Sequence, residues 1–453
     1  MTDTIAAIAT PPGQGAIGIV RLSGPDSARI GQVLFHSSRA HRIAFRPYHL
    51  HHGQLRHPDG QFIDEVLIVF MPGPSSFTGE DVLEIHGHGG TTVLAAILDA
   101  CVQQGARLAC AGEFSKRAVL NGRMDLTQAE AIMELISAQS QTAATLAGSK
   151  LTGHLGALLR DLRQQLETLR VLLCVAVDFP EEEVDCLEPA ECAARIQAVH
   201  DTLGSLVASY ERNRCWRDGA LVVLAGQVNA GKSSLLNAIL GRERAIVTAS
   251  PGTTRDYLEE TVLLDGLPIR LVDTAGLRET TDQAESCGIT QSLSLVGQAQ
   301  IVVLVIDAVH GPGSEDYALL DSTTPVLIGA NKIDLLTAMP DWTCHTPWSE
   351  QRVLPISARH GQGIDALLQA IRQQLVSAPP AEGAIVPNLR QYEALTRAKA
   401  ELADMLHDLH NQTPYDVLSV RLDLACTLLG ELTGEIRSED ILNMVFADFC
   451  IGK

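Results

Sequence analysis

The sequence lacks the features of a membrane, exported or metal-cluster protein. No uncharged apolar stretch reaches the length of a membrane span, and the start MTDTIAAIATPPG has neither the charged region nor the apolar core of a signal peptide. Its 10 cysteines include no C-x-x-C pair, which argues against a zinc ribbon or a disulfide framework. We therefore expect a soluble, cytoplasmic protein in which most cysteines are small buried apolar residues.

Basic residues are scarce as well. The chain carries 34 Lys and Arg against 54 Asp and Glu, which gives a formal net charge of −20. A protein that coats nucleic acid through bulk charge needs the opposite excess, so only a local basic patch remains open. With 453 residues the chain exceeds what one hydrophobic core usually organises, and we expect about three domains.

A phosphate-binding loop stands near the middle of the chain. GQVNAGKS, at 226–233, has the G-x-x-x-x-G-K-[ST] spacing and directly follows the apolar run at 220–225. Glycines let successive backbone N–H groups curl around phosphates, while Lys232 and Ser233 would meet phosphate oxygens and Mg²⁺ respectively. Because this pattern also occurs by chance, the motifs that accompany it decide its meaning.

A second nucleotide element follows at the end of another apolar run. IRLVDTAG, at 269–276, ends in the D-x-x-G pattern, in which Asp273 can hold Mg²⁺ and the Gly276 amide can meet a γ-phosphate. Between the two elements, TASPGTTRD at 248–256 has the position of a first switch, where Thr254 can complete the Mg²⁺ coordination. The alternative for this segment is a plain surface loop.

Two further motifs indicate guanine rather than adenine. VLIGANKID, at 326–334, delivers Asn331, Lys332 and Asp334, and a carboxylate can accept both N–H donors of a guanine edge, a pair that adenine lacks. VLPISAR, at 353–359, places Ser357 and Ala358 where GTP-binding domains support the guanine O6. The residues predicted to bind GTP are Asn229, Ala230, Gly231, Lys232, Ser233, Ser234, Thr248, Thr253, Thr254, Asp273, Thr274, Ala275, Gly276, Asn331, Lys332, Asp334, Ser357, Ala358 and Arg359.

Hydrolysis poses a problem for this sequence. Leu277 stands where a Ras-like protein has the glutamine that orients the attacking water, and an aliphatic side chain cannot do that. Either the protein is catalytically silent, or another polar group substitutes; the acidic stretch that follows offers Glu279, Asp282 and Glu285, and we favour a substitute. Asn229 has a side-chain oxygen suited to hold a monovalent cation beside the phosphates, in place of an arginine finger.

Changes in amino-acid composition and in the spacing of apolar residues along the chain indicate its domains. Residues 1–118 are rich in Gly, Pro and His with short β-like runs, which predicts an α+β module, and its histidines are expected to be solvated or hydrogen-bonded rather than metal ligands. Residues 119–216 have Leu, Ala and Gln at helical spacing, with no proline until Pro180, and predict long helices. The nucleotide domain occupies 217–377, and helical texture returns at 378–453 after a linker-like segment. The nucleotide domain is therefore expected to be inserted into a helical domain.

Three segments outside these motifs carry a family resemblance. They are DTIAAIATPPGQGAIGIVRLSG at 3–24, GEFSKRAVLNGRMDLTQAEAI at 112–132 and the terminal CIGK at 450–453. With the nucleotide motifs, they make the whole chain resemble the MnmE (TrmE) family of tRNA-modification GTPases. The resemblance implies a multidomain α/β plus α protein, with an N-terminal α+β folate-binding and dimerisation domain at 1–118, a helical bundle domain at 119–216 and 378–453, and an inserted Ras-like P-loop G domain at 217–377.

The resemblance also implies an activity. Family members are K⁺-dependent GTPases that act with an FAD- and NADH-dependent partner of the MnmG type. Together they add a carboxymethylaminomethyl or aminomethyl group to C5 of the wobble uridine of certain tRNAs, using a one-carbon unit from a tetrahydrofolate derivative in its 5-formyl or 5,10-methylene form. The family forms homodimers and, with the partner, heterotetramers. The rival interpretation is a regulatory or ribosome-assembly GTPase without modification chemistry.

Site residues carry over from the family motif by motif. The resemblance implies a catalytic Glu285 that positions the hydrolytic water, and it implies ligands in three further sets: K⁺ at Asn229, Thr248, Ser250 and Thr253; Mg²⁺ at Ser233 and Thr254; and folate at Arg21, Glu84, Arg123 and Lys453.

The chain departs from the family in two places. Arg123 replaces the usual lysine, which keeps the charge but changes the geometry, and Gln227-Val228 replaces the Arg-Pro of many members, which leaves the backbone amides in place. Cys450 has two interpretations: its thiolate acts as a catalytic nucleophile, or the tail only closes the folate pocket.

Overall fold

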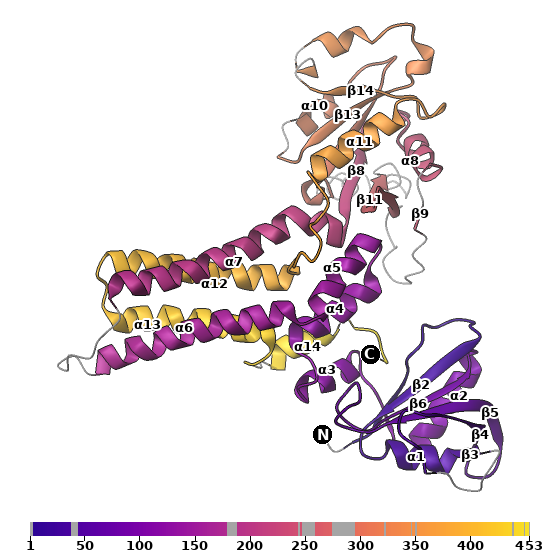
Figure 1. Cartoon of the computed structure of the whole chain (residues 1–453). Helices are drawn as coiled ribbons and strands as arrows, with labels where there is room; N and C mark the ends of the chain where they lie inside the picture. Colours follow the sequence, from indigo (N-terminus) through magenta and orange to yellow (C-terminus); the bar gives the residue numbers. More distant parts are fainter. Residues whose placement is uncertain are drawn as a thin grey trace, which may run out of the picture. The chain divides into compact units, whose positions relative to one another are not determined.

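The computed structural model describes residues 3–37, 44–178, 188–242, 245–246, 259–273, 295–320, 323–345, 347–348, 351–436, 439–447 and 449–452. The chain divides into two compact units: the first comprises Met1–Met133, Lys150–Gly204 and Glu393–Lys453, and the second Glu134–Ser149 and Ser205–Tyr392. The long segment of the second unit is thus inserted between two segments of the first. Figure 1 labels many of the elements along the chain.

A seven-stranded sheet opens the first unit, in the order β3-β4-β5-β6-β2-β1-β7. Its pairs are antiparallel except β1 with β7. Residues alternate across the sheet: Val20 and Leu22 are buried with Ile30 and Ile97 of the helices α1 and α2. The elements are β1 (Ile5–Ile8), β2 (Ile17–Ser23), α1 (Ser27–Leu34), β3 (Phe35–Ser37), β4 (Leu50–Arg56), β5 (Phe62–Met71), β6 (Val82–His88), α2 (Thr91–Gln103) and β7 (Arg107–Leu108).

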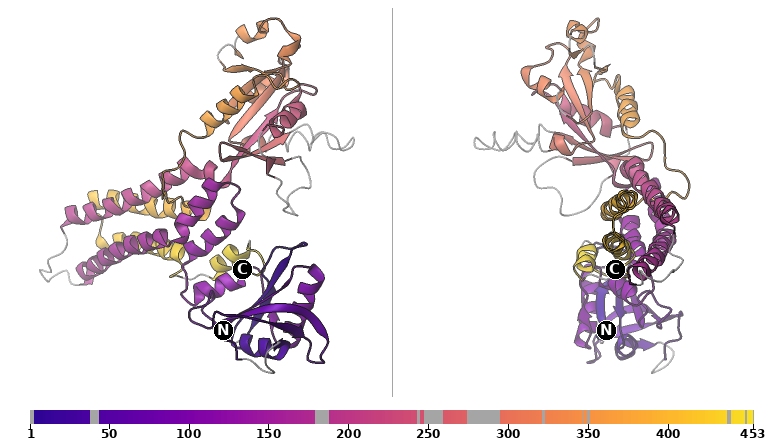
Figure 2. Two further views of the ribbon diagram at one scale, coloured as in Figure 1. Left: turned by 45° about the vertical axis from the view of Figure 1, so that its right-hand side comes forward. Right: turned by 90° about the vertical axis from the view of Figure 1, so that its left-hand side faces the viewer.

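Helices follow, as the sequence predicts, with lengths from 8 to 30 residues. They are α3 (Glu113–Leu120), α4 (Leu126–Ser137), α5 (Gln141–Leu151), α6 (His154–Asp178), α7 (Pro189–Asp218), α12 (Leu389–His410), α13 (Tyr415–Thr433) and α14 (Glu439–Ala447). Within the first unit α6 packs along α13, and the two lie side by side in Figures 1 and 2. Buried leucines at helical spacing explain the packing, including Leu155, Leu159, Leu162 and Leu166 on α6.

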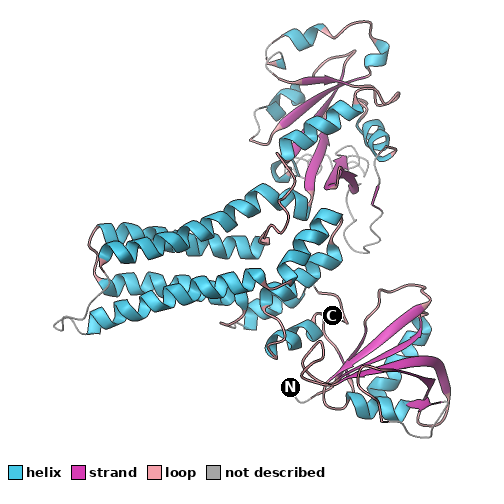
Figure 3. Ribbon diagram, in the orientation of Figure 1, coloured by secondary structure: helices cyan, strands magenta, loops and turns pink. Residues whose placement is uncertain are grey.

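A second seven-stranded sheet forms the centre of the second unit, in the order β14-β13-β12-β8-β11-β10-β9. The strands β14, β13, β12, β8 and β11 are parallel, and Figure 3 shows the sheet with helices beside it. The elements are β8 (Ala220–Ala225), α8 (Lys232–Leu240), β9 (Ala245–Ile246), β10 (Glu259–Leu264), β11 (Leu267–Asp273), β12 (Ile301–Asp307), α10 (Ser314–Leu320), β13 (Val326–Asn331), the short 3₁₀ turns η2 (Ile333–Leu335) and η3 (Asp341–Cys344), β14 (Val353–Pro355) and α11 (Ile364–Leu375).

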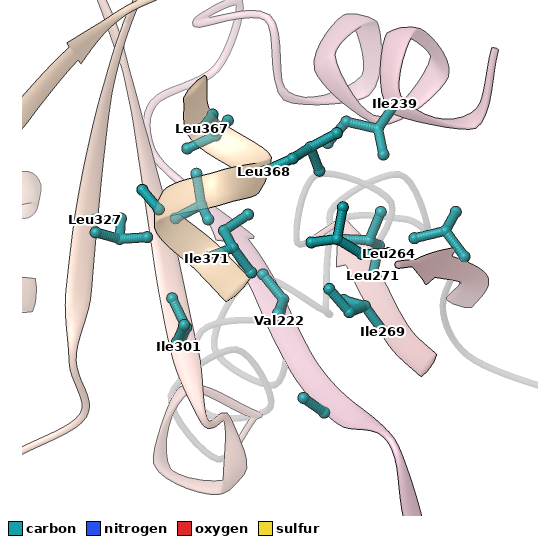
Figure 4. Packing of buried hydrophobic residues seen from close by; sticks show 14 of the residues in the cluster. Val222, Ile239, Leu264, Ile269, Leu271, Ile301, Leu327, Leu367, Leu368 and Ile371 are labelled. Atoms are coloured by element: carbon teal, nitrogen blue, oxygen red, sulfur yellow. The ribbon is translucent and has the colours of Figure 1, made fainter. Parts of the chain in front are cut away.

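The core of this sheet explains its uninterrupted apolar runs. All six residues of β8 are buried, as expected of a parallel strand covered on both faces. On one face, α11 presents Leu367, Leu368 and Ile371 at helical spacing, close to Val222 and Ile301 of the sheet (Figure 4).

The segment after α11, predicted to be linker-like, is bound to the end of α7. Ser209 Oγ donates to Ile385 O at 2.8 Å, and Trp216 Nε1 donates to Ala378 O at 3.2 Å. Just after this segment, the ring of Tyr392 in α12 stacks on the ring of Tyr210, with 4.3 Å between the ring centroids. The chain segments that lead into the second sheet and out of it are therefore joined within the second unit. Within the described residues, no helix combines the length and the apolarity that crossing a membrane requires.

Candidate functional site

The predicted nucleotide motifs meet at one edge of the second sheet. Because β8, β11, β12 and β13 run parallel, their carboxyl ends lie at the same edge. The phosphate loop follows β8, Asp273 ends β11, and Asn331 ends β13. Residues far apart in the sequence are thus placed to act on one ligand.

The phosphate loop has the backbone conformation that its sequence predicts. Gly231 lies in the left-handed region with φ 98° immediately before α8, and Asn229 also has a positive φ of 66°. A side chain at Gly226 would collide with the carbonyl of Val305. Lys232 is buried and donates to the loop carbonyls of Gly226 at 2.8 Å and Gln227 at 2.9 Å. The loop is therefore held closed at the N-terminus of a helix, where backbone N–H groups suit a phosphate.

Two oxygen ligands expected for Mg²⁺ are brought together. Ser233 Oγ donates to Asp273 Oδ2 at 2.6 Å, and the Asp273 side chain is buried. Hydroxyl and carboxylate oxygens are the ligands that Mg²⁺ accepts. The Ser233 and Asp273 oxygens are therefore suited to hold the Mg²⁺ ion that accompanies a nucleoside triphosphate.

The guanine motifs are tied to each other and to the phosphate loop. Asn331 Nδ2 donates to Ala230 O at 2.8 Å, and its Oδ1 accepts from the N–H of Ala358 at 2.9 Å. Ser357 Oγ donates to Asp334 Oδ1 at 2.6 Å, and this hydrogen bond is the main cause that holds the pKa of Asp334 below its usual value. A lowered pKa keeps the carboxylate charged, as an acceptor of guanine N–H donors must be.

A cavity of about 220 Å³ opens beside the phosphate loop. Asn229, Ala230, Asp307 and Lys332 are among the residues that line it. Sequence reasoning missed Asp307, although a signal was present: Asp307 ends the apolar run IVVLVID as Asp273 ends IRLVD.

A second group of predicted residues meets in the first unit. Arg21 and Glu84 are direct partners across β2 and β6, with Arg21 Nε donating to Glu84 Oε1 at 2.8 Å. Arg21 also donates to the carbonyl of Gly452 in the C-terminal tail at 3.2 Å. Burial would raise the pKa of Glu84, but a hydrogen bond from His86 and the charge of Arg21 together lower it.

The surroundings of this pair include residues that the sequence did not indicate. The Arg21 guanidinium lies over the rings of Phe77 and Phe114, with centroid distances of 5.6 and 5.9 Å. Arg123, predicted to bind folate, donates to Ser76 O at 3.0 Å and so contacts the loop that carries Phe77. A charged pair beside aromatic rings suits a flat heterocycle with an anionic tail.

Cys450 lies two residues before Gly452, whose carbonyl accepts the hydrogen bond from Arg21. Its side chain is exposed, and its carbonyl accepts from the N–H of Gly112 at 3.4 Å. The tail is thus bound to the start of α3 through its backbone. Neither interpretation of the thiol, nucleophile or part of a closing tail, is decided by this contact.

The remaining predicted site residues divide into two groups. Ser234 and Arg359 lie in the second unit with exposed side chains. The others lie outside the described residues, and their roles stay predictions: Thr248, Ser250, Thr253, Thr254, Thr274, Ala275, Gly276, Glu285 and Lys453.

Known families match this chain over its whole length. A family model described as the GTP-binding protein TrmE N-terminus matches residues 4–123, and one described as the MnmE helical domain matches residues 126–450. A protein named tRNA modification GTPase MnmE from Nitratidesulfovibrio vulgaris strain DP4 is 52% identical over 468 residues, covering 100% of this chain and 99% of its own length. The chain belongs to the MnmE family.

A second MnmE protein, from Lawsonia intracellularis, is 44% identical over 459 residues and is covered, like this chain, to 100%. Membership of this family confirms the resemblance and the predicted fold class, an N-terminal α+β domain with a helical domain and a P-loop G domain. The domain boundaries at 118, 216 and 377 stay predictions.

Solved structures match only part of the chain. Era from Aquifex aeolicus bound to GDP and AlF₄⁻ is 25% identical, with a TM-score of 0.29, and the match covers 40% of this chain and 66% of Era. The G domain of the FeoB iron transporter of T. maritima is 27% identical, with a TM-score of 0.27, and the match covers 34% of this chain and 98% of that domain.

Proposed function

We propose that this chain is a K⁺-dependent GTPase that works with an FAD- and NADH-dependent partner on the wobble uridine of certain tRNAs. The reaction adds a carboxymethylaminomethyl or aminomethyl group to C5, with a tetrahydrofolate derivative as one-carbon source. Membership of the MnmE family over the full length supports the proposal. The observation that carries it is the convergence of phosphate-loop, Mg²⁺ and guanine residues at one sheet edge.

The described residues fit a guanine nucleotide with Mg²⁺. Asp334, held by Ser357, would accept the two N–H donors of the guanine edge, and Asn331 would keep the base-binding segment against the phosphate loop. Ser233 and Asp273 would hold Mg²⁺, together with Thr254, which lies outside the described residues. Mg²⁺ supplies charge neutralisation on the phosphates when bound. The chain's own contribution is to hold these groups in place.

The K⁺ site is proposed with Asn229 as its described ligand. Its side chain is exposed on the phosphate loop, and the positive φ of 66° turns this residue out of the ordinary backbone region. Thr248, Ser250 and Thr253 would complete the site, and Glu285 would position the hydrolytic water. K⁺ would supply the positive charge that an arginine finger brings elsewhere.

The N-terminal α+β domain at 1–118 would hold the folate and form the homodimer. Arg21, Arg123 and Lys453 are cations suited to the glutamate tail of a folate, and the Glu84 carboxylate suits the N–H donors of a pterin. The hydrogen bond from Arg21 to Gly452 O supports a role of the C-terminal tail in this proposed site. We propose a cytoplasmic heterotetramer with the MnmG-type partner, with tRNA as substrate.

Steady-state GTP hydrolysis in KCl against NaCl at equal ionic strength tests the proposed activity. Equal ionic strength keeps screening constant, so that only the fit of the cation varies. We expect turnover to be strongly faster in KCl, and the Asn229→Ala variant to lose this preference while still binding GDP. Equal rates in the two salts, or an unchanged preference in Asn229→Ala, would reject the cation-dependent mechanism.

A further inference from the structure

Asp307 occupies a position between the two halves of the nucleotide site. It is the last residue of β12, and β12 lies between β8 and β13 in the sheet. The strand register pairs Asp307 directly with Asn331. Asp307 therefore lies at the sheet edge between the phosphate loop and the N-K-x-D segment, residues 331–334.

The Asp307 carboxylate accepts three hydrogen bonds. Its Oδ2 accepts from Lys332 Nζ at 2.8 Å and from His310 Nδ1 at 2.9 Å, and its Oδ1 accepts from the N–H of Val309 at 2.9 Å. Burial would raise the pKa of Asp307, but these hydrogen bonds outweigh it and lower the pKa to about 2. The carboxylate therefore keeps its charge at any physiological pH.

The ion pair with Asp307 fixes the position of the Lys332 ammonium. The other two side chains of the motif are already fixed, Asn331 by the phosphate loop and Asp334 by Ser357. Lys332 has a flexible four-carbon stem, so its ammonium requires a partner to hold one position. Asp307 is that partner, and both side chains line the cavity beside the phosphate loop.

We propose that Asp307 is a positioning residue of the guanine-nucleotide site, which holds Lys332 so that its stem lies ready against a bound nucleoside. Asp307 acts through Lys332 and not through contact with the nucleotide. The inference rests on the proposed function and adds a residue that none of the sequence motifs contains. Its physical basis is preorganisation: a side chain fixed before binding loses less conformational entropy when the ligand arrives.

A double-mutant cycle on the full-length protein tests this role. The dissociation constant and dissociation rate of fluorescent mant-GDP are measured for wild type, Asp307→Ala, Lys332→Ala and the double variant. We expect Asp307→Ala to weaken mant-GDP binding roughly tenfold, mainly through faster dissociation. The reason is that Lys332 loses the charge-assisted hydrogen bond to Asp307 that holds it in place. In the Lys332→Ala background the Asp307 substitution is expected to have no further effect, because its target is gone.

The matched control is Asp365→Ala. It removes a carboxylate that pairs with Arg242 at 2.6 Å in the same unit, and it is expected to leave mant-GDP binding unchanged. If Asp307→Ala does not fold, Asp307→Asn keeps an acceptor oxygen without the charge and should show a smaller loss with the same dependence on Lys332.

Two results would overturn the positioning role. One is unchanged mant-GDP affinity in the Asp307 variants while wild type binds tightly. The other is a loss of the same size in the presence and absence of Lys332, which would reveal a general structural effect. A wild-type protein that does not bind mant-GDP would instead overturn the proposed GTPase function, and the positioning role with it.

Discussion

At the scale of single residues, the contact between Asp334 and Ser357 prepares the site for one base. The serine hydroxyl has a single proton and donates it to Oδ1 of the carboxylate, at 2.6 Å. The remaining lone pairs of Asp334 can then accept from a ligand that offers two N–H donors. Guanine offers that pair, and xanthine replaces one of the donors with a carbonyl.

The Asp334→Asn variant should therefore change base preference. Its amide group presents N–H donors to the base, which repel those of guanine and pair with the carbonyl of xanthine. We expect GDP binding to weaken, and the preference for GDP over XDP to shift by at least roughly tenfold towards XDP, because mispaired buried polar groups are costly. Competition binding with both nucleotides measures this, and Asp365→Asn serves as the control. A variant that retains the wild-type preference would contradict the assignment of Asp334 to the guanine edge.

At the scale of elements, a buried carboxylate fastens the end of β6 to β5 in the first unit. Asp64 Oδ1 accepts from His88 Nδ1 at 2.7 Å, and Asp64 Oδ2 accepts from the His88 backbone N–H at 2.8 Å. The hydrogen bond that His88 donates to Asp64 is the main cause that raises the pKa of His88, and the charges of Asp64 and Glu65 contribute. Protonated His88 thus binds the sheet more strongly than the neutral form.

This pair makes the stability of the first unit depend on pH. A folded-state pKa raised above the unfolded value of about 6.5 gives stabilisation that is complete below that value and is lost as the pH rises through the folded pKa. We expect the melting temperature of wild type to exceed that of His88→Ala more at pH about 5.5 than at pH about 9. His410→Ala, at the exposed end of α12, controls for the loss of a histidine. A difference between wild type and His88→Ala that stays constant with pH would refute the linkage.

The elements also show what the sequence could predict about the site. The sequence placed nucleotide motifs at the ends of apolar runs, next to Gly226, Asp273 and Asn331. The parallel pairing of these strands, which the structure shows, brings the motifs to one edge of the sheet. Asp307 has the same signal but no motif, and its pairing with Lys332 depends on the register of β12 with β13.

Contacts between distant segments lay beyond the sequence pattern. The segment after α11 has the composition of a free linker, yet its carbonyls accept hydrogen bonds from Ser209 and Trp216. The placement of Phe77 and Phe114 around Arg21 likewise arises from tertiary packing, which propensity and spacing do not encode. Arg21 and Glu84 were named through the resemblance, and the register of β2 with β6 brings them together.

At the scale of the whole molecule, the two candidate sites belong to different units. The Arg21–Glu84 pair and the C-terminal tail lie in the first unit, and the nucleotide residues lie in the second. The second unit's long segment is inserted between two segments of the first. We propose that a conformational change in the nucleotide domain therefore acts on the chain at both connections. In this proposal, the GTPase cycle serves chemistry elsewhere in the molecule.

The most direct test measures the modified nucleoside itself. The purified chain is combined with the proposed FAD-dependent partner, NADH, tRNA, a methylene-tetrahydrofolate, ammonium or glycine, and GTP in KCl, and the digested tRNA is analysed by mass spectrometry. We predict C5-substituted wobble uridine with wild type, and none with Ser233→Ala, which removes one half of the Ser233–Asp273 oxygen pair. A wild-type protein that hydrolyses GTP normally and leaves the wobble uridine unsubstituted would contradict the account and identify a regulatory GTPase instead.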